Sequence, residues 1–301
     1  MSGPSITLFE NMRAIGYVPF YLAIQRGDWA REGVDVRVET ASDMTQTAAA
    51  LLDGRTDVSW GGPMRVMMHH DRDRECPLVC FAQVVARDPF ILVGRKPNPR
   101  FRFRDLAHKR IAVAIEAPTP WMTFQDDLAR AGVDSATLDR APDREMAENA
   151  KLLESGDLDV VQLFEPYADD LVEKGAGYIW HRFAARGEIA YTSFYTTRRF
   201  AADQRDTCRA LVRGIACAQQ ALHRETPLAI AEAIADFFPD RATAQLARII
   251  DGYRKSGLWA RTPELPAAAF VRLKAVLLSG GLIGYDAPYD ELVDAELSAA
   301  P

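Results

Sequence analysis

The sequence predicts an α/β protein of two lobes, with a ligand cleft between the lobes and a helical C-terminal wrap. Strand and helix signals alternate along the first third of the chain, and a second alternating series follows a proline-punctuated connector at residues 95–99. From Ala201 onward the pattern is almost entirely helical. Alternating strands and helices form a parallel sheet with crossover helices. The 301 residues fit two domains of about 100–200 residues each.

The first lobe begins with three strands separated by helices. Alternating or continuous apolar residues predict the strands, and glycines such as Gly33 and Gly54 end the helices. A long apolar stretch follows at residues 78–85 and 90–93. The predicted strands are Ile6–Phe9, Val34–Glu39 and Asp57–Trp60, and the predicted helices are Tyr17–Arg31, Thr45–Leu52 and Met64–Asp71.

The second lobe repeats this alternation, and the chain then returns to the first lobe through a strand at Ile189–Thr196. The predicted strands are Ile111–Ile115, Val160–Phe164 and Tyr178–His181, and the helices are Trp121–Ala131, Arg144–Ser155 and Pro166–Glu173. Four C-terminal helices are predicted at Asp203–His223, Pro227–Phe237, Arg241–Ser256 and Pro266–Ser279. We therefore expect a discontinuous lobe one (1–96 plus 194–301) and an inserted lobe two (97–193), joined by two crossing strands that form a hinge.

Composition excludes several classes of protein. The net charge is -6 and acidic residues are interspersed nearly everywhere, so no nucleic-acid partner is expected. No apolar run approaches the ~20 residues of a membrane span. A strand signal starting at Ile6 leaves no room for a signal peptide, so we expect a cytoplasmic protein if the chain is as encoded and a periplasmic one if a signal peptide was removed. The four cysteines show no metal or disulfide spacing and are expected to be buried thiols.

No catalytic or metal-binding constellation is recognisable. His69 and His70 are adjacent on a predicted helix and point about 100° apart, so they cannot easily share a metal, and we expect them at a surface helix end. The chain has no GxSxG, HExxH or phosphate-loop motif. We expect no catalytic residue, no metal and no cofactor, and more weight falls on a binding protein than on an enzyme.

Candidate ligand-binding residues follow the predicted parallel strands, because ligands of open α/β sheets bind at the strands' carboxyl ends. After the first strand come Asn11, which can donate and accept, and Tyr17, which can stack. After the third come Trp60, Gly61, Gly62 and Arg65. The glycines allow backbone approach to a ligand, Trp60 offers a flat apolar wall, and Arg65 could reach an anion or simply decorate its helix.

The second lobe has similar candidates. Glu116 ends a buried strand and could receive an amine-like donor or be an exposed loop charge, and Thr119 is a fair N-cap before Pro120. Trp121 follows, and Glu165 stands where the next strand meets a helix. Thr192, on the returning strand, carries a hydroxyl that could face the cleft.

Several segments resemble one known family, the substrate-binding proteins for nitrate, sulfonate, taurine and thiamine-pyrimidine precursors. The resemblance spans about residues 5–240, and each motif alone is weak, but together in order they are fairly specific. They are Asn11 with Tyr17–Ala23, Gly27–Trp29 and Glu32–Val36, the step Leu52–Val58, the lobe-two entry Leu106–Val113, the second step Gly156–Val160, and Phe164-Glu165-Pro166.

The resemblance implies a type II periplasmic-binding-protein fold, an interlobe ligand and delivery to an ABC transporter permease, by a monomer. It also implies cleft positions at Asn11, Tyr17, Trp60–Gly62, Glu116–Trp121 and Glu165. The same family includes the fungal pyrimidine synthase, a cytoplasmic enzyme. Its reactive lysine and histidine are matched here by Gly61 and Arg65, and the returning segment Tyr191–Thr197 lacks its cysteines, so that chemistry is not expected.

Two functions follow as hypotheses. The first is a solute-binding protein, whose small-molecule ligand we expect to be a planar heterocycle such as a thiamine pyrimidine precursor, because Tyr17, Trp60 and Trp121 are aromatic and Glu116 and Glu165 accept hydrogen bonds. Sulfonates or aromatic acids are the alternative ligands: a sulfonate would prefer more basic residues and fewer acids, whereas Arg13 and Arg65 leave an aromatic acid open. The second hypothesis is a cytoplasmic enzyme of the same fold, pyrimidine-pathway or decarboxylase-like.

Overall fold

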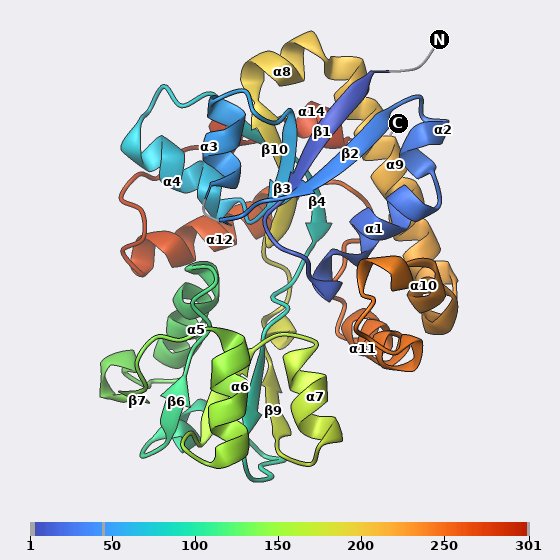
Figure 1. Cartoon of the computed structure of the whole chain (residues 1–301). Coiled ribbons are helices and arrows are strands. Elements are labelled where there is room, and N and C mark those ends of the chain that lie inside the picture. The colour runs from blue at the N-terminus through green and yellow to red at the C-terminus, as the bar shows by residue number, and fades with distance from the viewer. Residues whose placement is uncertain (1–3, 44–45, 300–301) are drawn as a thin grey trace. The chain divides into compact units, whose positions relative to one another are not determined.

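A computed structural model describes residues 4–43 and 46–299. The chain forms two compact units, each of which is an α/β sheet structure (Figure 1). Unit 1 contains the chain up to Arg87, Glu188–Lys274 and the chain from Ile283, and unit 2 contains Asp88–Gly187 and Ala275–Leu282. The predicted α/β class is confirmed. The ligand cleft between the lobes stays a prediction.

Unit 1 has a five-stranded sheet in the order β2-β1-β3-β10-β4. Strand β1 pairs in parallel with β2 and with β3. Strand β10 is antiparallel to both β3 and β4. The carboxyl ends of β1 and β3 therefore meet the beginning of β10 at one edge of the sheet. The strands are β1 (Ser5–Glu10), β2 (Asp35–Thr40), β3 (Val58–Gly61), β4 (Leu78–Val85) and β10 (Thr192–Thr197).

Helices cover both faces of this sheet, with α3 and α4 on one side and α1 and α9 on the other (Figure 1). The core between the sheet and α9 holds Phe20, Phe81 and Phe194. Trp29 packs against α9, because Gly214 has no side chain and a Cβ there would lie 2.1 Å from the indole ring. The helices are α1 (Val18–Gln25), α2 (Asp28–Arg31), α3 (Thr47–Leu52), α4 (Met64–Arg72), α8 (Arg198–Asp203), α9 (Arg205–Arg224), α10 (Pro227–Ala233), α11 (Thr243–Lys255), α12 (Ala267–Ser279, whose residues from Ala275 onward belong to unit 2), α13 (Tyr289–Leu292) and α14 (Ala295–Ser298).

Unit 2 has a second five-stranded sheet in the order β7-β6-β8-β5-β9, in which β5 is antiparallel to both neighbours. Its strands are β5 (Ile91–Gly94), β6 (Arg110–Ala112), β7 (Asp139–Arg140), β8 (Val160–Leu163) and β9 (Tyr178–Arg182). Its helices are α5 (Thr119–Arg130), α6 (Met146–Ser155) and α7 (Tyr167–Glu173).

The structure differs from the sequence expectations in several boundaries. The unit boundaries fall at 87/88 and 187/188, because β5 pairs within the second sheet, whereas we predicted 96/97 and 193/194. The helix predicted at Tyr17–Arg31 is interrupted at Gly27, whose φ of 66° is left-handed and ends α1. Helix α3 starts at Thr47, and the predicted start at Thr45 lies outside the described residues.

Candidate functional site

Four polar side chains meet at the carboxyl edge of the unit 1 sheet, and we call Asn11, Tyr17, Arg65 and Thr192 the unit 1 site. The strand register explains why they meet: Glu10 is level with Trp60, and Gly61 is level with Ser193. Asn11 therefore follows β1 at the same edge where Thr192 begins β10. The turn Ile15–Tyr17 and helix α4 bring in the other two residues.

The hydroxyl of Tyr17 is the centre of this group. Burial raises its pKa, while the positive charge of Arg65 and interactions with the side chains of Asn11 and Thr192 act in the opposite direction. Tyr17 as a whole is only partly buried. The sequence prediction grouped these four residues by strand ends alone, and the structure places them around one hydroxyl.

Arg65 lies inside the unit rather than on its helix surface, since the residue is only 7% exposed. Its Nη1 lies 3.5 Å from the position a Cβ would take at Gly61, and 3.7 Å from that at Gly62. A Cβ at Gly61 would also approach the Tyr195 hydroxyl at 3.2 Å. The two glycines therefore admit protein side chains, whereas we expected them to admit ligand directly. Tyr195 was not predicted, because no local pattern links it to Arg65.

Two further observations describe the polarity of the site. The Oδ1 atom of Asn11 is buried and has no hydrogen-bond partner among the described residues. The second nearby arginine, Arg13, is engaged elsewhere: it donates to the buried Glu10 carboxylate at 2.8 Å and its guanidinium lies 5.1 Å from the Tyr21 ring centre. The Glu10–Arg13 pair is neutral overall, so the charge offered at this edge comes from Arg65.

Trp60 is not the ligand wall that we expected. The residue is 0% exposed, and its ring stacks on Phe20 with centroids 4.1 Å apart. Tyr17 and Tyr21 contact it edge-on. Alternation along β3 places Trp60 on the core face, so its apolar surface stabilises unit 1 and leaves no ring face for a ligand.

Glu116 in unit 2 acts as a helix cap. Its Oε1 accepts the backbone N–H of Met146 at 2.7 Å, at the first residue of α6, and its Oε2 accepts the N–H of Ile115 at 3.0 Å. A carboxylate at a helix N-terminus is stabilising because the first N–H groups have no partner within the helix. The Glu116 carboxylate, which we expected to meet a ligand amine, therefore already accepts backbone N–H groups of unit 2. Thr119 begins α5 without making a side-chain cap, so the predicted N-cap was wrong by one residue.

Trp121 and Glu165 also have partners within unit 2. The guanidinium of Arg140 lies 4.5 Å from the Trp121 ring centre, which places a cation over one face of the ring. Glu165 is 4% exposed and its Oε2 accepts the N–H of Asp169 at 2.8 Å, near the start of α7. Burial raises the pKa of Glu165 to about 7, partly offset by this hydrogen bond and by Arg182.

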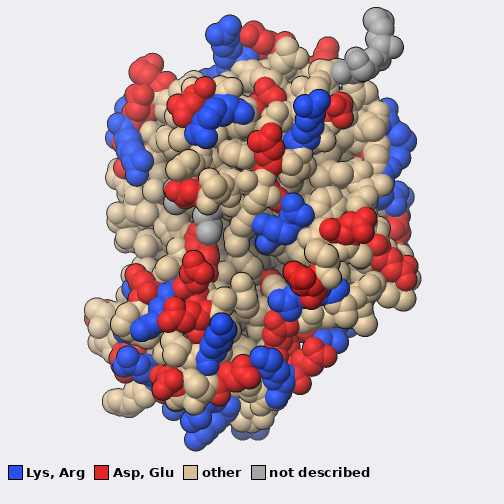
Figure 2. Space-filling model, in the orientation of Figure 1, with Lys and Arg blue, Asp and Glu red and all other residues tan. Residues whose placement is uncertain are grey.

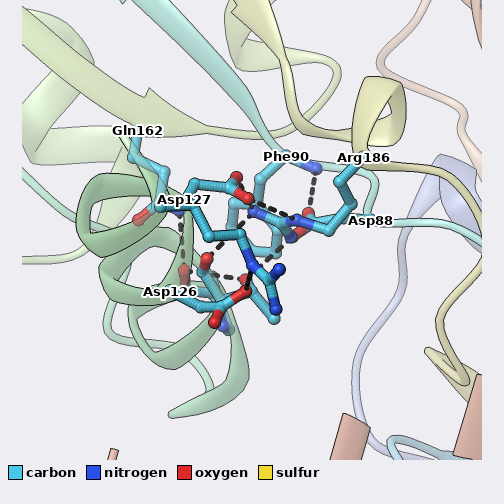
Figure 3. A network of polar contacts seen from close by, with 9 residues as sticks. Asp88, Phe90, Asp126, Asp127, Gln162 and Arg186 are labelled. Atoms are coloured by element: carbon cyan, nitrogen blue, oxygen red, sulfur yellow. Dashed lines mark hydrogen bonds and ion pairs between the residues drawn. The ribbon is translucent and has the colours of Figure 1, made fainter. Parts of the chain in front are cut away.

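A buried polar network holds α5 in unit 2 (Figure 3). Arg186 forms ion pairs with Asp88 and with Asp127 of α5, and its Nη2 donates to the Thr123 carbonyl at 3.1 Å. Thr123 in turn donates to Asp88 at 3.0 Å. This network was missed in the sequence because its members are far apart in the chain. It orients the helix whose first turn carries Thr119 and Trp121.

Features of other classes of site are absent from the parts of the chain that the structure describes. No group of three metal-ligating side chains occurs within residues 4–43 and 46–299. No described helix is long and apolar enough to span a bilayer.

The cysteines are free, with Cys217 exposed rather than buried as expected. His70 is buried and contacts the Leu78 carbonyl at 2.9 Å, so the surface position predicted for it was wrong. Lys, Arg, Asp and Glu are interspersed over the visible surface (Figure 2).

Comparison with known proteins identifies relatives along the whole chain. The family described as NMT1/THI5 like matches residues 15–226. Putative binding protein YtlA of Bacillus subtilis (strain 168) is 27% identical over 295 residues, which are 97% of this chain and 88% of the relative. Two solved structures are also similar. SsuA from Xanthomonas axonopodis pv. citri, an alkanesulfonate-binding protein bound to MOPS, has a TM-score of 0.74, 14% identity and coverage of 96% and 97%.

The second solved structure is the periplasmic nitrate-binding protein NrtA from Synechocystis PCC 6803, with a TM-score of 0.73 and 14% identity over 97% of this chain and 86% of that chain. At these identities the likeness concerns the fold. It confirms the periplasmic-binding-protein fold that the sequence motifs predicted.

Proposed function

The chain belongs to the NMT1/THI5-like family, and on that premise we propose that it is the solute-binding component of an ABC importer and that its ligand carries an acidic group. The observation that carries the ligand class is the enclosed Arg65 guanidinium beside the Tyr17 hydroxyl. Arginine and hydroxyl donors recognise carboxylates and sulfonates through charge-assisted hydrogen bonds. The relatives that bind an alkanesulfonate and nitrate are consistent with such a ligand.

The unit 1 site supplies the remaining contacts. Tyr17 and Thr192 offer hydroxyl groups, and the side-chain amide of Asn11 is buried with an oxygen that lacks a partner. A buried amide oxygen without a partner costs free energy, which is recovered when an N–H or O–H elsewhere on the ligand donates to it, while the acidic group of the ligand meets Arg65. We assign Asn11, Tyr17, Arg65 and Thr192 to ligand binding on this basis.

A planar heterocycle rich in donors has less support. The residues that favoured it have other partners: Trp60 stacks on Phe20, Glu116 caps α6, and Glu165 accepts the N–H of Asp169. Among the ligands that the sequence left open, sulfonates and aromatic acids fit the unit 1 site better. The partner that the proposal implies is an ABC permease, served by a monomeric binding protein.

Calorimetric titration and thermal-shift screening test the proposal. The panel contains MOPS, an alkanesulfonate, nitrate, an aromatic carboxylate, and the neutral 4-amino-5-hydroxymethyl-2-methylpyrimidine. An anionic member should raise the unfolding free energy by about 2.7 kcal/mol at one hundred times its Kd and be recovered unchanged. Binding of the neutral pyrimidine alone would overturn the acidic-ligand proposal. A panel in which nothing binds, or in which a bound compound is converted, would count against the solute-binding role itself.

A further inference from the structure

A cavity of about 310 Å³ in unit 1 lies beside the edge strand β4. The segment from Gly257 to Pro266 closes one side of it, held by hydrogen bonds from Ala260 N–H to the Val84 carbonyl and from Gln83 N–H to the Pro263 carbonyl, at 3.0 and 2.8 Å. None of Asn11, Tyr17, Arg65 and Thr192 lines it. The residues that matter for its chemistry are Gln83, Arg87, His223, Arg254, Trp259 and Arg261.

Three arginines line this cavity: Arg87, Arg254 and the exposed Arg261. Arg87 and Arg254 are both partly buried, and each is held by a carbonyl: Arg87 Nη1 donates to Ser256 at 3.2 Å and Arg254 Nη1 to Glu225 at 2.7 Å. Arg254 Nη2 also pairs with Asp251 at 3.7 Å. A guanidinium has five N–H donors, so these contacts position the two arginine side chains without using every donor. Two exposed acids, Glu188 and Glu264, are also present in the lining.

The pKa of His223 reflects the positive charge around its imidazole. Its Nε2 lies 3.3 Å from the Ala260 carbonyl, and burial together with the charges of Arg261 and Arg254 lowers its pKa. Both arginines therefore act on the same imidazole, and all three residues line the cavity. The lowered pKa favours the neutral imidazole, so His223 adds little charge to that of the arginines.

A buried polar group in the lining lacks a partner. Gln83 is 1% exposed, and its Oε1 has no hydrogen-bond partner within the described part of the chain. Both backbone groups of Gln83 have partners: its carbonyl accepts from Gln219 Nε2 at 3.0 Å, and its N–H donates to the Pro263 carbonyl at 2.8 Å. A buried amide of this kind is rare in folded proteins unless a ligand or ordered water completes it.

We propose that this cavity is a second ligand site for a small oxyanion that keeps an O–H group, such as hydrogen phosphate: its oxygens accept hydrogen bonds from Arg87, Arg254 and Arg261, and its O–H donates to Gln83 Oε1. This proposal rests on the arginine-lined cavity, whereas the proposed transport ligand rests on Arg65 beside Tyr17. Either proposal can therefore fail without the other. The volume is near the lower end of small-molecule pockets and fits a small ligand.

The test uses the full chain with inorganic phosphate and, separately, acetate, followed by NMR of the histidine rings. Saturable binding should raise the pKa of His223, because an anion beside it offsets the two arginine charges. Arg261→Gln should raise the half-saturating concentration about tenfold, as expected for loss of one charge-assisted contact. Arg224→Gln is the matched control: Arg224 is the exposed neighbour of His223 and does not line the cavity.

Gln83→Leu is a second variant that removes the unpartnered amide without removing a charge. It should keep the fold and lose most of the response. Phosphate should give the stronger response, because acetate has no donor for Gln83 Oε1, and a response to acetate alone would contradict the proposed role of Gln83. An unchanged His223 signal with both probes overturns the site, as does equal weakening by Arg261→Gln and Arg224→Gln, which would indicate only general screening of charge.

Discussion

Asp88 and Arg186 form a buried ion pair between the first residue of unit 2 and a residue next to the point where the chain leaves it. Their side chains are 0% and 5% exposed. The pair therefore joins the entering and leaving segments of unit 2 to each other, and Asp127 extends the contact to α5. Separating the two segments would leave a buried charge without its partner, which costs free energy. The ion pair therefore holds these segments in position.

Arg186→Met should lower the free energy of unfolding of unit 2 by about 3–5 kcal/mol, since Asp88 and Asp127 would lose their buried cation. Urea unfolding with hydrogen exchange at α5 measures this. The matched control is Arg130→Met on the same helix, whose 67% exposed side chain pairs with Asp126 and should cost about 1 kcal/mol or less. Equal costs for the two variants would show that the Arg186 network has no special role.

Arg65→Gln should weaken binding of the acidic ligand about ten- to a hundredfold, through loss of the charge that its carboxylate or sulfonate meets. Calorimetry on folded protein measures the change. Arg72→Gln serves as the control, because Arg72 is exposed on the same helix α4. Retained affinity in Arg65→Gln would remove Arg65 from the proposed binding site.

Trp60→Ala should destabilise unit 1 by about 3–5 kcal/mol, because a fully buried aromatic ring stacked on Phe20 is deleted. Trp121→Ala, which removes a partly exposed ring, should cost about 1 kcal/mol. Thermal and urea unfolding give both values. A stable Trp60→Ala protein with strongly reduced ligand affinity would instead support Trp60 as a ligand wall.

Glu116→Ala should cost about 1 kcal/mol of stability, because the N–H of Met146 loses the carboxylate that caps α6. Affinity for the acidic ligand should stay the same. Glu148→Ala is the control, since Glu148 lies on α6 itself but forms only an exposed ion pair with Arg144. A loss of affinity without a loss of stability would return Glu116 to the ligand-binding residues.

Glu165 should make stability depend on pH. Its pKa is raised from 4.5 to about 7 by burial, so between these values the folded protein holds a proton that the unfolded chain has released. The free energy of unfolding should therefore fall as pH rises through this window, by about 3 kcal/mol in total at 1.36 kcal/mol per unit.

The Glu165→Gln variant should lose this dependence and gain stability relative to the wild type at pH 8 but not at pH 4.5. Urea midpoints across this range measure it. Glu173→Gln, at an exposed position on the same helix α7, should shift stability little at either pH. Parallel pH profiles for wild type and Glu165→Gln would contradict the proposed burial of the ionised carboxylate.

The sequence by itself determined the α/β class, the two-unit organisation, the family and the residues that gather at the unit 1 sheet edge. These follow from local patterns: alternation predicts strands, and strands that run parallel end at the same edge. Asn11, Arg65 and Thr192 could therefore be grouped without coordinates. The prediction of a planar ligand has less support than the grouping of these residues, because it assumed that the strand-end aromatic Trp60 faces the ligand, whereas its ring stacks on Phe20.

Only the tertiary structure decided which partner each of these side chains has. The stacking of Trp60 on Phe20, the capping of Met146 by Glu116 and the pairing of Arg186 with Asp88 join residues distant in sequence. Such contacts depend on how helices and sheets pack, which local periodicity does not specify. For that reason the positions of the candidate site could be predicted, whereas the charge that Arg65 offers there and the structural uses of Trp60, Glu116 and Glu165 emerged from the fold.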